Sequence, residues 1–288
     1  MTETTRNGAP AGPLAAPATA GSGRRAAGLV RRLGESNWIG FAFLGLVLLL
    51  WEVSVRAHWV QSFGFPAFSA VVVAFWQFLT SGEVVQVLLP SLQRWMIGYA
   101  IAIVVGVAIG LLMGYVTFFY KLLEPITELI RPIPSPAYVP VAIIFLGIDD
   151  AMKIFVIAFA SFFPIMINTF VGVRSIDAVQ MNTARTFGIP PLTTMWHVVL
   201  PAAAPYIFAG MRVSLALSLI LTIIAEMIAG NSGIGYYILL AQRSFRVGDM
   251  YAGIIVLGLI GYALNRLFLV VERRVLKWHL ATTGKGSA

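Results

Sequence analysis

The chain has 288 residues, of which 59% are hydrophobic and only 11% are charged, and its mean hydropathy is +0.86. A soluble domain carries about 25% charged residues, so this composition excludes a soluble globular enzyme and indicates a polytopic membrane protein. The net charge of +8 is typical of basic cytoplasmic loops facing anionic lipid. No basic stretch is interleaved with aromatic residues, so nucleic acid is not an expected partner.

The chain contains no cysteine and three histidines. Disulfides, thiolate metal sites and cysteine nucleophiles are therefore excluded. The histidines, at positions 58, 197 and 279, lie too far apart in the sequence to indicate a metal or haem site. We expect no metal, no cofactor and no catalytic residue in this chain.

Three segments are expected: a disordered cytoplasmic tail over 1–33, a transmembrane domain over 34–277, and a second cytoplasmic tail over 278–288. A membrane-spanning helix needs about 20 apolar residues. Residues 67–80 are too short to cross and are expected to lie in the interface, and Pro90 is expected to end a short apolar stretch before the second span. The sequence predicts an all-α protein with six spans, at about 38–55, 94–116, 137–148, 152–173, 206–229 and 250–271.

Three glycines in the second span, Gly106, Gly110 and Gly114, recur every four residues. Residues at that spacing lie on one face of a helix, and small residues there let two helix backbones approach closely in lipid. We therefore expect this face to pack directly against another helix.

Five prolines lie between residues 125 and 140, at the entrance to the third span. Irregular backbone at membrane depth persists only where protein buries it or where it lines a cavity. The short third span therefore cannot be an ordinary straight crossing. We place Pro134 and Pro136 in the candidate solute pathway or its gate.

The fifth span contains Arg212 and Glu226, and charges inside a membrane are functional by default because they are costly there. Ser218, Thr222 and Glu226 recur every four residues, and we interpret this stripe as facing the pore. The alternative is that these residues bond to neighbouring helices. Arg212 suits an anionic solute because a guanidinium binds oxyanions in a bidentate manner. Asn168, in the fourth span, either bonds between helices or contacts the solute.

The distribution of Lys and Arg favours cytoplasmic N- and C-termini, because most of the basic residues outside the spans then face the cytoplasm. This orientation also places the polar interval 174–205 there. The interval contains a short helical segment, Gly188, a second amphipathic segment, and Pro201 at the start of the fifth span. Gly188 suits the sharp turn at a helix C-terminus. A helical knob of this kind suits docking of a soluble partner, although a plain interfacial loop helix gives the same pattern.

The same interval resembles the cytoplasmic signature of permease subunits of ATP-binding-cassette (ABC) importers: Glu-Ala-Ala, three residues, Gly, nine residues, Ile, one residue, Leu-Pro. Asn182 replaces the Glu and Thr183 the first Ala, a departure that affects an ion pair made by that Glu but keeps the helix–turn geometry. The spacing is kept throughout. The other matching residues are Ala184, Gly188, Val198 (in place of Ile), Leu200 and Pro201.

Further segments resemble the nitrate, sulfonate and taurine branch of these permeases. The resemblance extends over residues 38–275 and is carried by 129–140, 147–148, 153–155, 162–165, 168–169 and 172–175. It implies a type I ABC importer permease in the cell membrane, with a small solute such as nitrate, taurine or an alkane sulfonate.

The resemblance also implies partners. Two copies of the chain, as a homodimer in the lipid bilayer, would form the pore, two ATPase subunits would each receive one coupling helix at about 182–196, and an extracytoplasmic binding protein would deliver solute. The chain has no phosphate-binding glycine loop, so ATP hydrolysis is expected in a separate subunit. The implied ATPase-coupling residues are Asn182, Thr183, Ala184, Arg185, Phe187, Gly188, Trp196, Leu200 and Pro201.

Two other classes of function would need features that differ from these. A stand-alone channel or secondary carrier would be supported by an inverted repeat, but the first three spans show no clear match to the last three. An intramembrane enzyme would need a catalytic constellation, and Asp149–Asp150 is the only adjacent carboxylate pair in the sequence.

Overall fold

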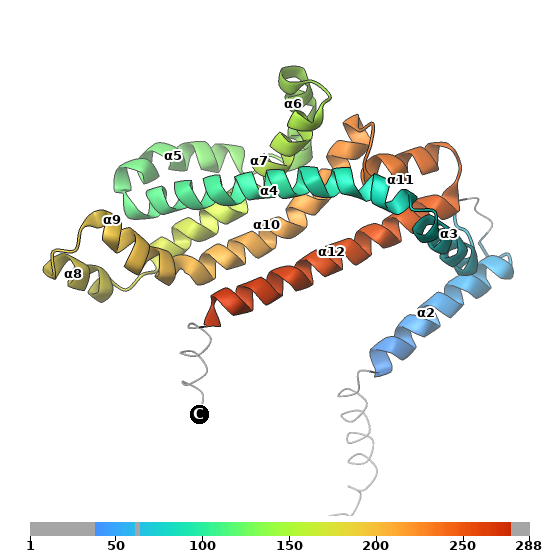
Figure 1. Ribbon diagram of the computed structural model, residues 1–288, viewed down its shortest axis with the longest axis horizontal. Coiled ribbons are helices and arrows are strands. Elements are labelled where there is room, and N and C mark those ends of the chain that lie inside the picture. The colour runs from blue at the N-terminus through green and yellow to red at the C-terminus, as the bar shows by residue number, and fades with distance from the viewer. Residues whose placement is uncertain (1–37, 61–63, 278–288) are drawn as a thin grey trace, which may run out of the picture. The chain divides into compact units, whose positions relative to one another are not determined.

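The computed structural model describes residues 38–60 and 64–277, and every regular element within those ranges is a helix (Figure 1). The prediction of an all-α protein is therefore confirmed. The expected tails, 1–33 and 278–288, lie outside the described residues. In chain order the helices are α2 (Trp38–Arg56), α3 (Phe68–Thr80), α4 (Glu83–Tyr115), α5 (Thr117–Ile130), the 3-10 helix η1 (Ser135–Ala137), α6 (Tyr138–Leu146), α7 (Asp150–Arg174), α8 (Ala178–Thr186), α9 (Pro191–Thr194), the π-helix η2 (Met195–Val199), α10 (Leu200–Ala229), α11 (Ile234–Arg243) and α12 (Val247–Val275).

Helix α2 belongs to a separate compact unit at the N-terminal end. Its 19 residues coincide with the expected first span. Phe41, Leu44 and Leu49 are each more than half exposed, so the helix presents the apolar surface that a lipid-facing span needs. Near its end Glu52 pairs with Arg56 one turn on, at 2.6 Å.

The second unit contains the remaining helices. Among the described residues four helical runs are long and apolar enough to cross a membrane: α4, α7, the run Pro191–Ala229 that includes α10, and α12. A fifth crossing is present if α5 and the bent segment Ser135–Leu146 count as one span. These runs match five of the expected spans in position. The count of six, with α2 as the first span, stays a prediction with which the structure is compatible.

The expected break at Pro90 is wrong, because α4 runs without interruption from Glu83 and is 33 residues long. A proline inside a helix removes one backbone hydrogen bond and crowds the carbonyl four residues earlier. In α4 tertiary contacts just beyond the proline offset that cost. Ser91 and Arg94 are both buried and hydrogen-bond to residues of distant helices.

The third span is bent, as the cluster of prolines predicts. The axes of α5 and of the segment Ser135–Leu146 differ by 86°, and the break between them holds Pro132 and Pro134. Helix α6 has nine residues, which reach about 14 Å, far less than the ~30 Å of a bilayer core. The crossing predicted for 137–148 therefore depends on α5 as well.

Helices α4, α7 and α10 form the centre of this unit, with α7 packed against both others (Figure 1). A Cβ atom added to Gly106, Gly110 or Gly114 of α4 would lie 3.0, 2.6 and 2.5 Å from atoms of α7. Gly210 of α10 is equally close to α7, since its Cβ would lie 2.7 Å from that of Asn168. The predicted small-residue face is confirmed, and it explains how three long helices pack backbone to backbone.

Helices α3, α11 and α12 share a second apolar cluster. Phe78 of α3 stacks on Tyr237 of α11 with ring centroids 4.6 Å apart. Burial raises the pKa of Tyr237 to about 12, so its hydroxyl stays neutral at physiological pH. Helix α3 is short and apolar, as expected for an interfacial segment, and it is packed against α12.

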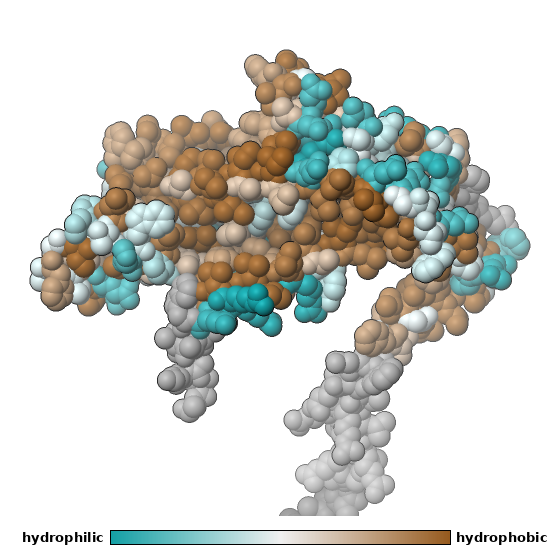
Figure 2. Space-filling view, in the orientation of Figure 1, coloured by the Kyte–Doolittle hydropathy of each residue, from teal (hydrophilic) through white to brown (hydrophobic). Residues whose placement is uncertain are grey.

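Apolar side chains cover most of the visible surface over the long helices, while polar side chains gather around α11 and near the α8–α9 end (Figure 2). Val104 of α4 and Leu267 of α12 are exposed by 69% and 61%. A contiguous apolar surface of this extent is rare on a water-facing protein, so it is the surface expected of membrane-embedded helices.

Candidate functional site

A helical hairpin, residues 178–199, joins the end of α7 to α10. Asp177 caps α8 by accepting a hydrogen bond from the backbone N–H of Val179 at 2.9 Å. Gly188 ends the helix with φ +64°, and the N–H of Ile189 donates to the carbonyl of Ala184 at 3.0 Å. A left-handed glycine just past a helix end is the usual helix stop, so the prediction for Gly188 is confirmed.

The outer side of the hairpin is apolar and exposed. Phe187, Leu192 and Trp196 are exposed by 78%, 71% and 60%. By contrast, Ala184 of α8 and Thr194 of α9 are both 4% exposed and form the inner side of the hairpin. Exposed apolar side chains are thus concentrated within ten residues of one short segment, as in segments that contact another protein.

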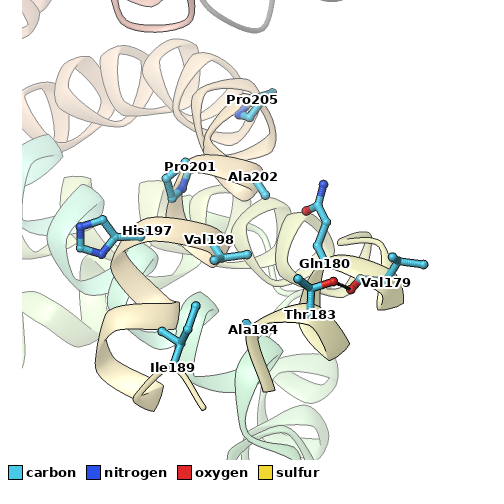
Figure 3. Close-up of a pocket in the computed structure, with 10 residues that line it drawn as sticks. All are labelled: Val179, Gln180, Thr183, Ala184, Ile189, His197, Val198, Pro201, Ala202 and Pro205. Carbon is cyan, nitrogen blue, oxygen red and sulfur yellow. Dashed lines mark hydrogen bonds between the residues drawn. The ribbon is translucent and has the colours of Figure 1, made fainter. Parts of the chain in front are cut away.

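An open cavity of about 530 Å³ lies between α8 and the first turns of α10 (Figure 3). Gln180 and Thr183 line it from α8, and Pro201, Ala202 and Pro205 line it from α10. Of the predicted coupling residues, Thr183, Ala184 and Pro201 border this cavity. Asn182, Arg185 and Gly188 are exposed on the hairpin, and Leu200 is half-buried at the start of α10.

The second half of the hairpin is continuous with α10. The π-helix Met195–Val199 passes directly into α10, so the helical run extends from Pro191 to Ala229. The fifth span was expected at about 206–229; the helix that contains it begins further upstream, and where the crossing itself starts stays a prediction. Pro201 would crowd the carbonyl four residues back in a regular helix, and the wider π turn before it relieves that conflict. A displacement of the hairpin therefore reaches α10 through uninterrupted helix.

The stripe Ser218, Thr222 and Glu226 of α10 is turned towards α4. The three residues are exposed by 0%, 2% and 0%. Ser218 accepts a hydrogen bond from the indole of Trp95 at 2.7 Å, and Thr222 donates to the carbonyl of Ser218. In the described structure Ser218 and Glu226 bond to α4, as the alternative expects, whereas Thr222 bonds within α10. A role of this stripe in the solute pathway stays a prediction.

Glu226 lies in a buried ion cluster that the sequence did not predict. Its carboxylate accepts hydrogen bonds from Arg94 and Ser91, both at 2.9 Å, and from the backbone N–H of Gly235 at 3.0 Å. Arg94 also donates to Asp150 at 2.8 Å and to the side chain of Ser232 at 2.7 Å. The cluster connects α4, α7, α10 and the start of α11.

Lys153 extends this cluster. Its ammonium lies 3.3 Å from the carboxylate of Asp150 and its side chain is 1% exposed. Two cations, Arg94 and Lys153, thus face two carboxylates, Glu226 and Asp150, so the cluster is balanced in charge.

Arg212 does not meet Glu226. It is exposed on α10 and borders a cavity of about 470 Å³ together with Gly261 and Asn265 of α12. The fourteen-residue separation places the two charges about four turns apart, and the ion cluster occupies the end of α10 remote from Arg212.

Asn168 and the proline-rich bend do come together. Asn168 borders a cavity of about 290 Å³ with Arg131, Ser135 and Tyr138. Pro134 and Pro136 flank Ser135 in η1. The Asn168 side-chain amide donates to the carbonyl of Pro164 on its own helix at 2.8 Å.

Comparison with known proteins decides the family. Residues 102–277, more than half of the chain, match the family described as "Binding-protein-dependent transport system inner membrane component". The chain belongs to this family. It is a permease subunit of an ABC importer, its role is transport rather than catalysis, and the family implies separate ATPase and binding-protein partners.

Named relatives of the permease handle sulfonates and nitrate. It is 31% identical to the "Putative aliphatic sulfonates transport permease protein SsuC" of Bacillus subtilis over 254 residues, which cover 86% of this chain and 90% of the relative. It is 35% identical to the "Nitrate import permease protein NrtB" of Synechocystis sp. over 186 residues, or 65% and 68% of the two chains. These relatives confirm the resemblance to the nitrate and sulfonate branch.

A solved structure shows the same fold. The permease matches an inward-facing structure of the MetNI methionine ABC transporter with a TM-score of 0.56 and 16% identity, over 67% of this chain and 94% of the other. At that identity the likeness concerns the fold alone. It confirms the type I importer architecture of the permease.

Two functional candidates were missed in the sequence, Arg94 and Arg131. Arg94 opens the expected second span, and Arg131 follows α5 at the break in the third. Each is a cation beside a long apolar run, and a cation at membrane depth needs a partner. The position of each cation was therefore informative, but its surroundings were not predictable. Arg94 pairs with Glu226, which is distant in the sequence, and Arg131 borders a cavity formed by several helices.

Proposed function

We propose that the permease imports a small oxyanion, such as nitrate, taurine or an alkane sulfonate, by ATP-driven alternating access. Two identical copies form the pathway, two ATPase subunits each bind one hairpin, and an extracytoplasmic binding protein delivers the solute. The observation that carries this proposal is the hairpin. It exposes Phe187, Leu192 and Trp196 on a helix pair whose second member continues into α10.

The nine proposed coupling residues divide into two kinds. Asn182, Arg185, Phe187 and Trp196 are exposed and contact the ATPase in this proposal. The others shape the hairpin: Ala184 is buried, Thr183 is exposed at the cavity between α8 and α10, Gly188 makes the turn, and Leu200 and Pro201 begin α10. Burial of apolar surface stabilises an interface by roughly 25 cal/mol per Å², so the exposed aromatic residues supply the largest share of the contact.

Cytoplasmic N- and C-termini are supported by the charges at the helix ends. Arg174 lies in the last turn of α7, and Arg273 and Arg274 lie in the last turn of α12. The first turns of the same two helices hold Asp150 and Asp249. The positive-inside rule then assigns the C-terminal ends of α7 and α12 to the cytoplasm, on the side of the hairpin. In this proposal 34–277 is the transmembrane domain, and 1–33 and 278–288 are cytoplasmic.

The class of solute is supported by the relatives' names, which specify aliphatic sulfonates and nitrate. Both are small oxyanions with delocalised negative charge. The solute must pass through the permease. The strongest candidates for residues that line its pathway are Asn168, Pro134, Pro136 and their neighbours. Arg212, on the exposed face of α10, is a second cation for the same solute, whereas Ser218, Thr222 and Glu226 support the helices around the pathway.

The test is reconstitution. The permease is placed in liposomes with its cognate ATPase and binding protein, and uptake of radiolabelled ethanesulfonate and of nitrate is measured with and without ATP. We expect uptake only with ATP. The variant Phe187→Ala should lose ATPase binding by at least about tenfold, because it removes a large exposed aromatic contact. Binding is measured by co-purification and titration.

The matched control is Phe118→Ala, since Phe118 is 67% exposed on α5 outside the hairpin. It should bind the ATPase as the unaltered permease does. Uptake by the permease alone along an ion gradient would instead support a secondary carrier or channel and would overturn the proposal.

A further inference from the structure

The cavity at the bend of the third span combines one cation with several neutral polar groups. It has a volume of about 290 Å³ and is bordered by Arg131, Ser135, Tyr138 and Asn168. Its apolar wall includes Phe163 and Pro164 of α7 and Leu217 of α10. A cavity of this size accepts a molecule of a few non-hydrogen atoms, and its lining offers both a charged end and an apolar end.

The cavity lies at the middle of two spans. Its α7 residues fall between positions 160 and 168 of a helix that runs from Asp150 to Arg174, and Leu217 is near the middle of α10. In secondary transporters, solute sites lie near the bilayer midplane, where a broken helix supplies polar groups, and the same physical reasoning applies to a break at mid-membrane here. The 86° bend after α5 is such a break, and Arg131 is the first residue beyond α5.

The polar groups of the cavity can donate hydrogen bonds to an anion. Asn168 uses one amide hydrogen on the carbonyl of Pro164, and its second amide hydrogen remains for a ligand. The hydroxyl of Tyr138 donates to the carbonyl of Ile130 at 3.1 Å, which fixes that ring at the cavity edge. Ser135 contributes a further hydroxyl between two prolines that hold its backbone rigid.

Arg131 is only loosely paired. Its guanidinium lies 3.8 Å from the carboxylate of Glu128, and the two side chains are exposed by 57% and 70%. An exposed ion pair of that geometry contributes little. Glu128 and Glu124 border a neighbouring cavity of about 230 Å³ that Arg131 also reaches. Arg131 therefore borders two cavities. The smaller one also contains Glu124 and Glu128, whereas in the larger one Arg131 is the only charged residue of the lining.

We propose that this cavity is a mid-membrane subsite for a small organic oxyanion, in which Arg131, Asn168 and Ser135 bind the sulfonate or equivalent headgroup. The apolar tail lies against Phe163 and Leu217. The carboxylate of Glu128 competes for the guanidinium, so the anion is held weakly enough to be released. The inference rests on the proposed function, and it assigns that function a solute-contacting residue which the sequence did not single out.

The experiment uses the full transporter in liposomes, with its ATPase and binding protein and with radiolabelled ethanesulfonate as the probe. Arg131→Ala should lower uptake by about tenfold or more, the effect of losing one charge-assisted contact. Arg131→Lys should restore part of it. Glu128→Gln should lower the KM for transport, because it removes the competing carboxylate. ATPase stimulation by the loaded binding protein should persist in all three, which reports an intact fold and intact coupling.

Lys121→Ala is the matched control, because Lys121 is an exposed cation on α5, the helix that Arg131 follows, and it lies outside the cavity. Equal uptake by Arg131→Ala and the unaltered permease, with ATP-dependent uptake in both, would overturn the subsite but not the proposed function. Loss of uptake together with ATPase stimulation in Arg131→Ala and Arg131→Lys would assign Arg131 a structural role and overturn the subsite as well. ATP-independent uptake by the unaltered permease would overturn the proposed function itself.

Discussion

The two ends of α10 differ in whether their side chains are exposed or buried. At the N-terminal end the hairpin exposes large apolar side chains on short helices. At the C-terminal end Glu226 is completely buried and accepts three hydrogen bonds from α4 and from α11. The helix between them has 30 residues, or about 45 Å.

The contrast separates groups that are satisfied within the chain from groups that are not. A buried carboxylate with an arginine, a serine and a backbone N–H needs no further partner. Exposed aromatic residues such as Phe187 still have apolar surface to bury. The ion cluster therefore anchors α10, and in the proposed function the hairpin is the end to which the ATPase binds.

The largest loss of stability is expected from Glu226→Gln, which removes one charge from the buried ion cluster. It leaves the buried Arg94 with only Asp150 as a charged partner, and removal of one member of a buried ion pair costs about 3–5 kcal/mol. We expect a large fall in the thermal unfolding temperature in detergent. Glu128→Gln, in an exposed pair, should change that temperature little. Equal unfolding temperatures for both variants would contradict the anchoring role.

A smaller effect is expected from Gly233→Ala at the same end. Gly233 has φ +106°, and an added Cβ would collide with the carboxylate of Glu226. With φ +106° and ψ 167° the backbone lies in a region that essentially only glycine adopts, which costs another residue about 1–3 kcal/mol, and the collision with the end of the Glu226 side chain adds to that cost. Thermal unfolding should report the sum, and the change should be smaller in a Glu226→Ala background, where the colliding carboxylate is absent.

The smallest loss of stability is expected from Gly188→Ala in the hairpin. Gly188 is also left-handed, with φ +64°, but a Cβ there would meet no atom within 4 Å. Only the conformational cost of about 1–2 kcal/mol remains, and it is confined to a local turn. We expect near-normal unfolding of the long helices but reduced ATPase stimulation by the binding protein. Normal stimulation would show that coupling does not depend on the shape of this turn.

The sequence predicted what local pattern controls. Apolar length located the long helices, the spacing of Gly106, Gly110 and Gly114 predicted the close contact of α4 with α7, and Gly188 marked the end of α8. The resemblance of 182–201 to the permease signature identified the hairpin. In each case the information lies within a few turns of one segment.

Long-range pairing was not predictable in the same way. Arg94 and Glu226 are 132 positions apart, and no local pattern pairs them. The stripe on α10 was correctly seen as one face, but which helix it would meet depends on the three-helix packing. The break predicted at Pro90 was wrong for the same reason. The hydrogen bonds of Ser91 and Arg94 that stabilise α4 beyond the proline are also made to a residue distant in the sequence.

The π-helix Met195–Val199 determines how the hairpin is rotated about the axis of α10. One residue corresponds to about 100° around an α-helix, so converting this wide turn into a regular one would swing Trp196 about a quarter turn about the α10 axis. A single-residue deletion there would keep every contacting side chain and still aim the aromatic surface in the wrong direction. If the ATPase binds the hairpin as proposed, its orientation relative to the permease depends on one additional residue in this turn.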